Sequence, residues 1–265
     1  IWPEDTYTGA MDDDFEPTLE TYVLDSEAPR PAVLILPGGG YGFTSPREAE
    51  PVALKFGAAN MHAFVLHYSC APRRHPQPLQ DAARAMTLIR KNANTWRVEP
   101  TQIAVCGFSA GGHLAASLGV HWDKPFARNH EGIDPAMTKP NALVLAYPVI
   151  SAGLHAHKGS FNNLLADQQT EEQLHLLSLE QHVTEGTPPA FLWHTLADAA
   201  VPVDNSLLFA GALSEHGVPF ELHVYPKGPH GLSLADTETN DEANADPHVA
   251  TWFALCTEWL GDSFA

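Results

Sequence analysis

The chain has 265 residues, of which 44% are hydrophobic and 17% charged, a composition that fits a globular protein with a full core. Its 32 acidic residues outweigh 14 Lys and Arg residues, and the formal charge of -18 argues against nucleic-acid partners and anionic membranes. No apolar run reaches about 18 residues and no secretion leader is visible, so we expect a cytoplasmic protein. Because the sequence begins with Ile1, secretion after removal of a leader stays open.

Short apolar runs alternate with helical patterns along most of the chain. Strands are expected at 32–36, 63–68, 103–106, 142–147, 190–194 and 220–225. Helices are expected at 79–96, 110–118, 204–216 and 247–260. This alternation predicts one α/β domain over residues 1–265, with a doubly wound, mostly parallel sheet and helices on both faces. Cysteines at 70, 106 and 256 are too widely spaced for a disulfide framework or a zinc site.

Residues 151–187 interrupt the alternation between the fourth and fifth expected strands. The segment is rich in Gln, His and Glu, and its stretch 170–178 is weakly helical. Insertions at the carboxyl ends of parallel strands usually overhang the ligand site. We therefore expect a small lid or substrate-side wall within the single domain.

The first expected strand leads into the glycine-rich sequence PGGGYG at 37–42. Glycines let a backbone N–H approach a developing negative charge closely, because no Cβ stands in the way. No Lys-Ser/Thr follows the run and its spacing is not Gly-x-Gly-x-x-Gly, so phosphate-loop and dinucleotide interpretations fail. The run instead predicts an oxyanion hole, with donors at Gly39 and Gly40.

The strand at 103–106 leads into GFSAG at 107–111, which presents Ser109 as a candidate nucleophile. A serine on a tight strand-to-helix turn is lifted clear of its neighbours, so small residues must flank it. Gly107 and Gly111 meet that requirement, and the N–H of Ala110 is the expected second oxyanion donor. Because Gly and Ser are common in loops, the pattern alone does not identify a nucleophile. An acid and a base must be found elsewhere in the chain.

An acid and a base follow the serine in the order that an α/β-hydrolase requires. Asp198 comes just after the strand at 190–194, and its rivals are Asp204, the expected N-cap of the next helix, and Asp167 in the insertion. His230 lies in the glycine-containing turn after the strand at 220–225. Of the other histidines, His113 is expected to pack near the site, His194 to remain on its strand, and His248 to lie on the surface.

These residues predict acyl transfer through a serine triad. Ser109 would attack an ester carbonyl while His230 takes its proton, and Asp198 would orient the imidazole. The amides at 39, 40 and 110 would hold the oxyanion. No metal or organic cofactor is required by this chemistry.

The motifs resemble the α/β-hydrolase superfamily over nearly the whole chain. The more specific likeness is to acetyl-xylan esterase-like carbohydrate esterases, neighbours of the hormone-sensitive-lipase-like and BD-FAE type esterases. Pro37 replaces the His of the lipase-like His-Gly-Gly-Gly motif, and Pro229 stands where glycine is commoner. The motifs that carry the likeness are LPGGGY at 36–41, GFSAGGHL at 107–114, PPAFLWHT at 188–195 and GPHG at 228–231.

The resemblance implies deacetylation of carbohydrates such as acetylated xylo-oligosaccharides. A short-chain carboxylesterase, a feruloyl esterase and a non-catalytic binding protein on a hydrolase fold remain the alternatives, because one scaffold hosts many chemistries. The expected partner is a small-molecule or oligosaccharide ester, and a homo-oligomer stays open. Polar and aromatic residues expected to contact such a substrate are Tyr41, His113 and His157.

Overall fold

A computed structural model of the chain describes residues 1–2, 6–9, 11 and 15–265. One seven-stranded sheet forms its centre, in the order β1-β3-β2-β4-β5-β6-β7. Five of its strand pairs are parallel, and only β1 with β3 is antiparallel. The prediction of a mostly parallel, doubly wound sheet is confirmed.

The strands are β1 (Thr18–Tyr22), β2 (Arg30–Leu36), β3 (His62–His67), β4 (Val98–Phe108), β5 (Ala142–Ala146), β6 (Ala190–Thr195) and β7 (Phe220–Tyr225). The α-helices are α1 (Glu50–Ala58), α2 (Gln77–Lys91), α3 (Ala93–Trp96), α4 (Ala110–His121), α5 (Pro125–Arg128), α6 (Lys158–Leu165), α7 (Glu171–Leu176), α8 (Asp204–Glu215) and α9 (Thr251–Ser263). Short 3-10 helices are η1 (Pro46–Glu48), η2 (Pro135–Met137), η3 (Ala166–Gln168) and η4 (Leu179–His182). None of the helices in the described part of the chain is long and apolar enough to cross a membrane.

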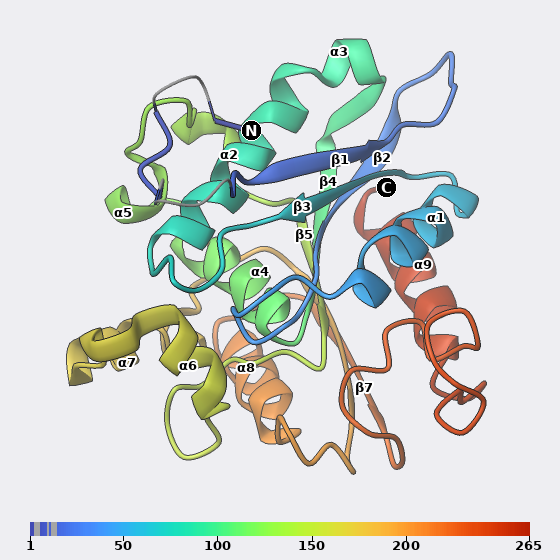
Figure 1. Cartoon of the computed structure of the whole chain (residues 1–265). Helices are drawn as coiled ribbons and strands as arrows, with labels where there is room; N and C mark the ends of the chain where they lie inside the picture. The colour runs from blue at the N-terminus through green and yellow to red at the C-terminus, as the bar shows by residue number, and fades with distance from the viewer. Residues whose placement is uncertain (3–5, 10, 12–14) are drawn as a thin grey trace.

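Helices cover both faces of the sheet (Figure 1), and an apolar cluster lies between each face and its helices. Helices α1 and α9 pack on one face, where Phe56 and Trp252 are fully buried. Helices α2, α4 and α8 pack on the other face, together with the insertion between β5 and β6. The central strands are buried on both faces, which explains why they read in the sequence as continuous apolar runs rather than alternating ones.

The structure differs from the sequence prediction where local patterns are weak. The edge strand β1 was not predicted, because its sequence TLETY is polar and mostly exposed. Helices α1 and α6 were not predicted either, and the expected helix 79–96 is divided at Asn92 between α2 and α3. The last helix begins at Thr251 rather than at 247, because the Asp246 carboxylate accepts bonds from the amides of His248 and Val249 and fixes a turn before the helix.

Candidate active site

The turn between β4 and α4 holds Ser109 in a strained backbone conformation. Its φ of 53° and ψ of -116° lie where side chains are rarely found. A Cβ on Gly107 would lie 2.2 Å from the carbonyl oxygen of Gly111, and one on Gly111 would lie 2.0 Å from the carbonyl oxygen of Leu36. The glycines are therefore required by close backbone approach, the physical reason behind the five-residue motif.

Replacing Gly111 by Ala should destabilise the fold by roughly 3 kcal/mol or more, because the new methyl group cannot avoid the backbone of β2. Gly211→Ala is the matched control, since that helical glycine has no atom within 4 Å of its would-be Cβ. The control should gain up to about 1 kcal/mol of stability. Denaturant unfolding of both variants measures the difference, and equal stabilities would show that the turn tolerates a side chain.

Three residues from three loops meet at the end of β4. His230 Nε2 lies 2.8 Å from Ser109 Oγ, and His230 Nδ1 lies 2.6 Å from Asp198 Oδ2. Ser109 follows β4, Asp198 follows β6, and His230 follows β7. The structure thus brings together the serine, acid and base candidates in a continuous hydrogen-bonded chain.

The environment of Asp198 favours its ionised form. Burial by itself raises the pKa of this carboxyl, but bonds from His194, His230 and the Val201 amide outweigh burial and leave the pKa below its usual range. The Oδ1 atom accepts from the amides of Ala200 and Val201, each at 2.9 Å. A carboxylate held in this way can fix the ring of His230 and balance the charge of its protonated form.

The rival candidates occupy other places. His194 is fully buried, with Nδ1 2.8 Å from Ser206 Oγ and Nε2 3.3 Å from Asp198 Oδ2, so it supports the acid. Asp204 was expected to cap α8, but it is the first residue of that helix and Val203 is the N-cap. The Asp204 carboxylate instead lies 3.6 Å from His155 Nδ1. Asp167 lies in η3.

The glycine loop after β2 presents free backbone donors. Gly39 and Gly40 have φ values of 129° and 62°, which favour glycine, and a Cβ on Gly39 would lie 2.1 Å from the Phe43 carbonyl oxygen. In the described residues, the amides of Gly39, Gly40 and Ala110 donate no hydrogen bond. These unpaired donors are the chemical requirement of an oxyanion hole.

Two of the expected substrate contacts are buried. Tyr41 is 2% exposed and His113 is 0% exposed, and the Tyr41 hydroxyl lies 2.8 Å from His113 Nδ1. The other ring nitrogen of His113 donates to the Leu177 carbonyl oxygen at 3.0 Å. Burial lowers the pKa of His113 to about 4, which keeps the ring neutral. Both side chains join the glycine loop and α4 to the insertion, and their contact with a substrate stays a prediction.

His157 lies at the start of the insertion and caps α6. Its Nδ1 accepts from the Ser160 amide and lies 2.8 Å from Ser160 Oγ. Burial lowers the pKa of His157, and the nearby charge of His230 lowers it further. From the same helix, Asn163 Nδ2 donates to the Gly40 carbonyl oxygen at 2.9 Å. The insertion therefore packs against the glycine loop, while its role as a lid stays a prediction.

Sequence reasoning missed two side chains that hold the glycine loop, Asn163 and the buried Glu48. The Glu48 carboxylate accepts a bond of 2.8 Å from the Gly38 amide. Neither residue belongs to a recognisable motif, and only the folded chain brings each to the loop. Among the described residues, no group of three or more His, Cys, Asp or Glu side chains is arranged to hold a metal.

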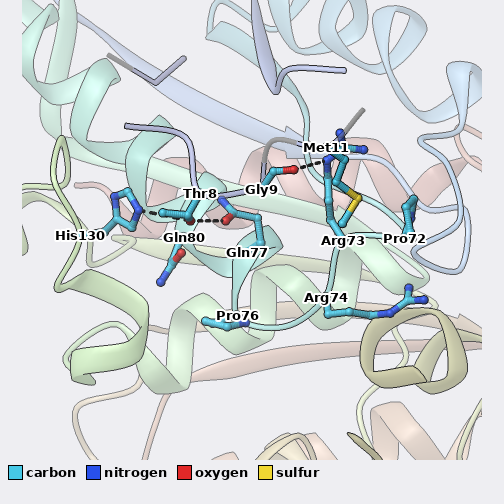
Figure 2. A pocket seen from close by; sticks show the side chains of 10 residues that line it. All are labelled: Thr8, Gly9, Met11, Pro72, Arg73, Arg74, Pro76, Gln77, Gln80 and His130. Carbon is cyan, nitrogen blue, oxygen red and sulfur yellow. Dashed lines mark hydrogen bonds between the residues drawn. The ribbon is translucent and has the colours of Figure 1, made fainter. Parts of the chain in front are cut away.

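A separate pocket of about 460 Å³ lies between the N-terminal segment and α2 (Figure 2). Its polar groups are bonded to one another: Thr8 Oγ1 donates to Gln77 Oε1 at 2.8 Å, and Arg73 Nε donates to the Gly9 carbonyl oxygen at 2.8 Å. Ser109, Asp198 and His230 do not line this pocket. It is therefore separate from the candidate active site.

The profile of the BD-FAE family matches residues 22–213. The chain belongs to the BD-FAE family. A crystal structure of an acetyl ester-xyloside bifunctional hydrolase from Caldicellulosiruptor lactoaceticus superposes with a TM-score of 0.85 and 42% identity, covering 94% of this chain and 89% of that one. This BD-FAE member therefore has the α/β-hydrolase fold expected from its motifs.

Two curated relatives extend the comparison. Endo-1,4-beta-xylanase B of Butyrivibrio fibrisolvens is 40% identical over 242 residues, which cover 90% of this chain and 38% of that protein. The acetylxylan esterase of Xylanibacter ruminicola is 26% identical over 237 residues, covering 86% of this chain and 46% of that protein. This chain thus spans less than half the length of either relative. The acetylxylan esterase and the structural neighbour group this BD-FAE member with the carboxylic ester hydrolases.

Proposed function

We propose that this chain is a serine esterase that removes short acyl groups, above all acetyl groups, from carbohydrates such as xylo-oligosaccharides. One observation carries the proposal: the hydrogen-bonded chain that runs from Ser109 through His230 to Asp198. A nucleophile, a base in contact with it and a carboxylate that orients the base are what acyl transfer through a covalent intermediate requires.

In this reaction Ser109 Oγ attacks the ester carbonyl and His230 Nε2 takes its proton. Asp198 holds the ring so that Nε2 faces the serine, and the amides of Gly39, Gly40 and Ala110 bind the oxyanion. His230 then passes its proton to the leaving alcohol, which yields an acyl-serine. Water, activated by the same histidine, releases the acid and restores the free serine.

The carbohydrate part of the proposal rests on the relatives. Two of them carry names that refer to xylan, and the structural neighbour is described as an acetyl ester-xyloside hydrolase. The insertion at 151–187 agrees with a polar substrate, because Gln, His and Glu are frequent in it. A lipase-like enzyme needs a more apolar cover for its acyl chain.

A substrate panel tests this proposal. Acetate release from acetylated xylo-oligosaccharides should exceed, in kcat/KM, the hydrolysis of p-nitrophenyl butyrate and methyl ferulate by roughly tenfold or more, because binding to the sugar adds to transition-state stabilisation. The three rates are measured with the same preparation. Fast hydrolysis of simple esters with no release from sugar acetates would identify a general carboxylesterase, and preference for methyl ferulate a feruloyl esterase.

A further inference from the structure

Glu48 is a buried carboxylate beside the site that the proposed mechanism does not use. Its exposure is 3%, and two donors converge on it: the Gly38 amide at 2.8 Å from Oε2 and the Tyr147 hydroxyl at 2.6 Å from Oε1. None of the described Lys, Arg or His nitrogens forms an ion pair with it. The neighbouring Arg47 guanidinium is bonded instead to the carbonyl oxygens of Thr239 and Gly231.

The hydrogen bonds of Glu48 favour the charged form. The Tyr147 hydroxyl oxygen already accepts from the Ser233 amide at 2.8 Å, so its proton is directed to Glu48. Both carboxylate oxygens therefore act as acceptors, which stabilises the ionised state. Burial raises the pKa of the Glu48 carboxyl above its usual value, and the bonds from Tyr147 and Gly38 and the charge of His230 oppose this rise without cancelling it.

One residue separates Glu48 from Ser109, and one residue separates it from His230. A Cβ built on Gly38 would lie 2.8 Å from Glu48 Oε2 and 3.0 Å from Ser109 Cβ, so one glycine separates the carboxylate from the nucleophile. On the other side, the ring of Tyr147 meets that of His230 edge to face, with centroids 5.0 Å apart. The same tyrosine is bonded to Ser233 in the loop that carries His230.

We propose that Glu48 is a second carboxylate of this site. It positions the glycine loop through Gly38, and its charge stabilises the protonated form of His230 that arises during acyl transfer. The inference rests on the proposed esterase function. Glu48 touches no reacting atom, so it is a positioning residue whose charge acts across Tyr147.

Other titratable groups share this environment and enter any pH profile. Asp198 and His157 face His230 from the acid loop and the insertion. Groups that interact with the charge of Glu48 come from the residue after β3, from β4, from the residue after β5 and from η1: they are Tyr68, Cys106, Tyr147 and Arg47. Burial raises the pKa of the Cys106 thiol well above its ordinary value, so this thiol stays neutral and does not titrate with the enzyme's base.

Glu48→Gln tests the charge while it keeps the shape of the side chain. We expect kcat/KM to fall by roughly tenfold or more, mostly in kcat, and the acidic limb of its pH profile to move to lower pH by roughly one unit. The direction follows because removal of a nearby anion makes protonation of the base harder. Glu50→Gln, at an exposed position two residues along, is the control and should leave both quantities unchanged.

Glu48→Asp and Tyr147→Phe separate the charge from the shape of the side chain. Glu48→Asp keeps a carboxylate at this position and should leave the acidic limb in place. Tyr147→Phe keeps the Glu48 side chain but removes one of the two bonds that favour its charged form, so its acidic limb should move to lower pH, as in Glu48→Gln. A Glu48→Gln enzyme that loses activity with an unchanged pH profile would reduce Glu48 to a structural link. So would an assigned ¹³C carboxyl signal showing Glu48 protonated at pH 7 in the unaltered protein, a measurement that needs no variant to fold.

The two proposals fail separately. If the unaltered protein hydrolyses no ester and its serine does not react with a fluorophosphonate, the proposed function is wrong. If it hydrolyses esters and reacts, but Glu48→Gln behaves like Glu50→Gln, only the role of Glu48 is wrong.

Discussion

Ser109→Ala should lower kcat for p-nitrophenyl acetate by roughly 10⁴–10⁶-fold while the protein stays folded. The physical reason is that the Oγ is the only atom of this side chain that can attack a carbonyl, and it lies 2.8 Å from the base. The oxyanion donors and the substrate contacts remain, so a residual rate above that of water should persist. Steady-state kinetics, with circular dichroism as the check on folding, measures the effect.

Ser214→Ala is the matched control for this change. Ser214 is an exposed residue of α8, and its replacement should leave kcat and KM unaltered. A Ser109→Ala protein that turns over the ester at the rate of this control would refute the triad and place the nucleophile elsewhere in the chain. Reaction of a fluorophosphonate with Ser109 and with no other serine would give independent support.

Asp198→Asn should lower kcat by roughly 10⁴-fold with a small effect on substrate binding. The Asn amide is nearly isosteric, but its NH₂ group can donate to Nδ1 of His230 and so place the ring proton on Nε2, facing Ser109. The ring then cannot take the serine proton. The loss should be larger here than a lost hydrogen bond alone, because His194 and His230 both face the same carboxylate oxygen in the unaltered protein.

Asp204→Asn serves as the control for Asp198→Asn. Its carboxylate is 46% exposed and pairs with His155 at the start of α8, so its removal should change kcat by less than about twofold. If both variants kept full activity, the acid would have to be sought elsewhere in the chain. If both lost it equally, the effect would lie in the loop between β6 and α8 rather than in the charge of Asp198.

The central strands and the motifs at their ends could be predicted from the sequence because their signals are local. A strand buried on both faces must be apolar throughout, as β5 is. Position 111 admits only glycine, because a Cβ there would lie 2.0 Å from the Leu36 carbonyl oxygen. The serine, the acid and the base each follow a recognisable parallel strand, β4, β6 and β7, so all three lie at the same edge of the sheet. These features depend on a few neighbouring residues and on fold-wide rules of strand connection.

Other features could not be predicted because they depend on residues far apart in the chain. The polar strand β1 exists only because β3 offers it an edge, and α1 depends on apolar contacts with α9 rather than on a strong local pattern. The same limit applies to Tyr41 and His113. Their burial and their bond to each other depend on the fold and could not be predicted from the sequence.

By itself, the sequence determined the fold class and the three residues whose side chains meet at the end of β4. The tertiary structure alone decided how those residues are supported: the second histidine on Asp198, the insertion bonded to Gly40, and the buried carboxylate of Glu48 between the glycine loop and Tyr147. The reason is physical. A nucleophile turn imposes its own sequence, whereas a buried charge is stabilised by donors from separate loops, and only folding brings those donors together.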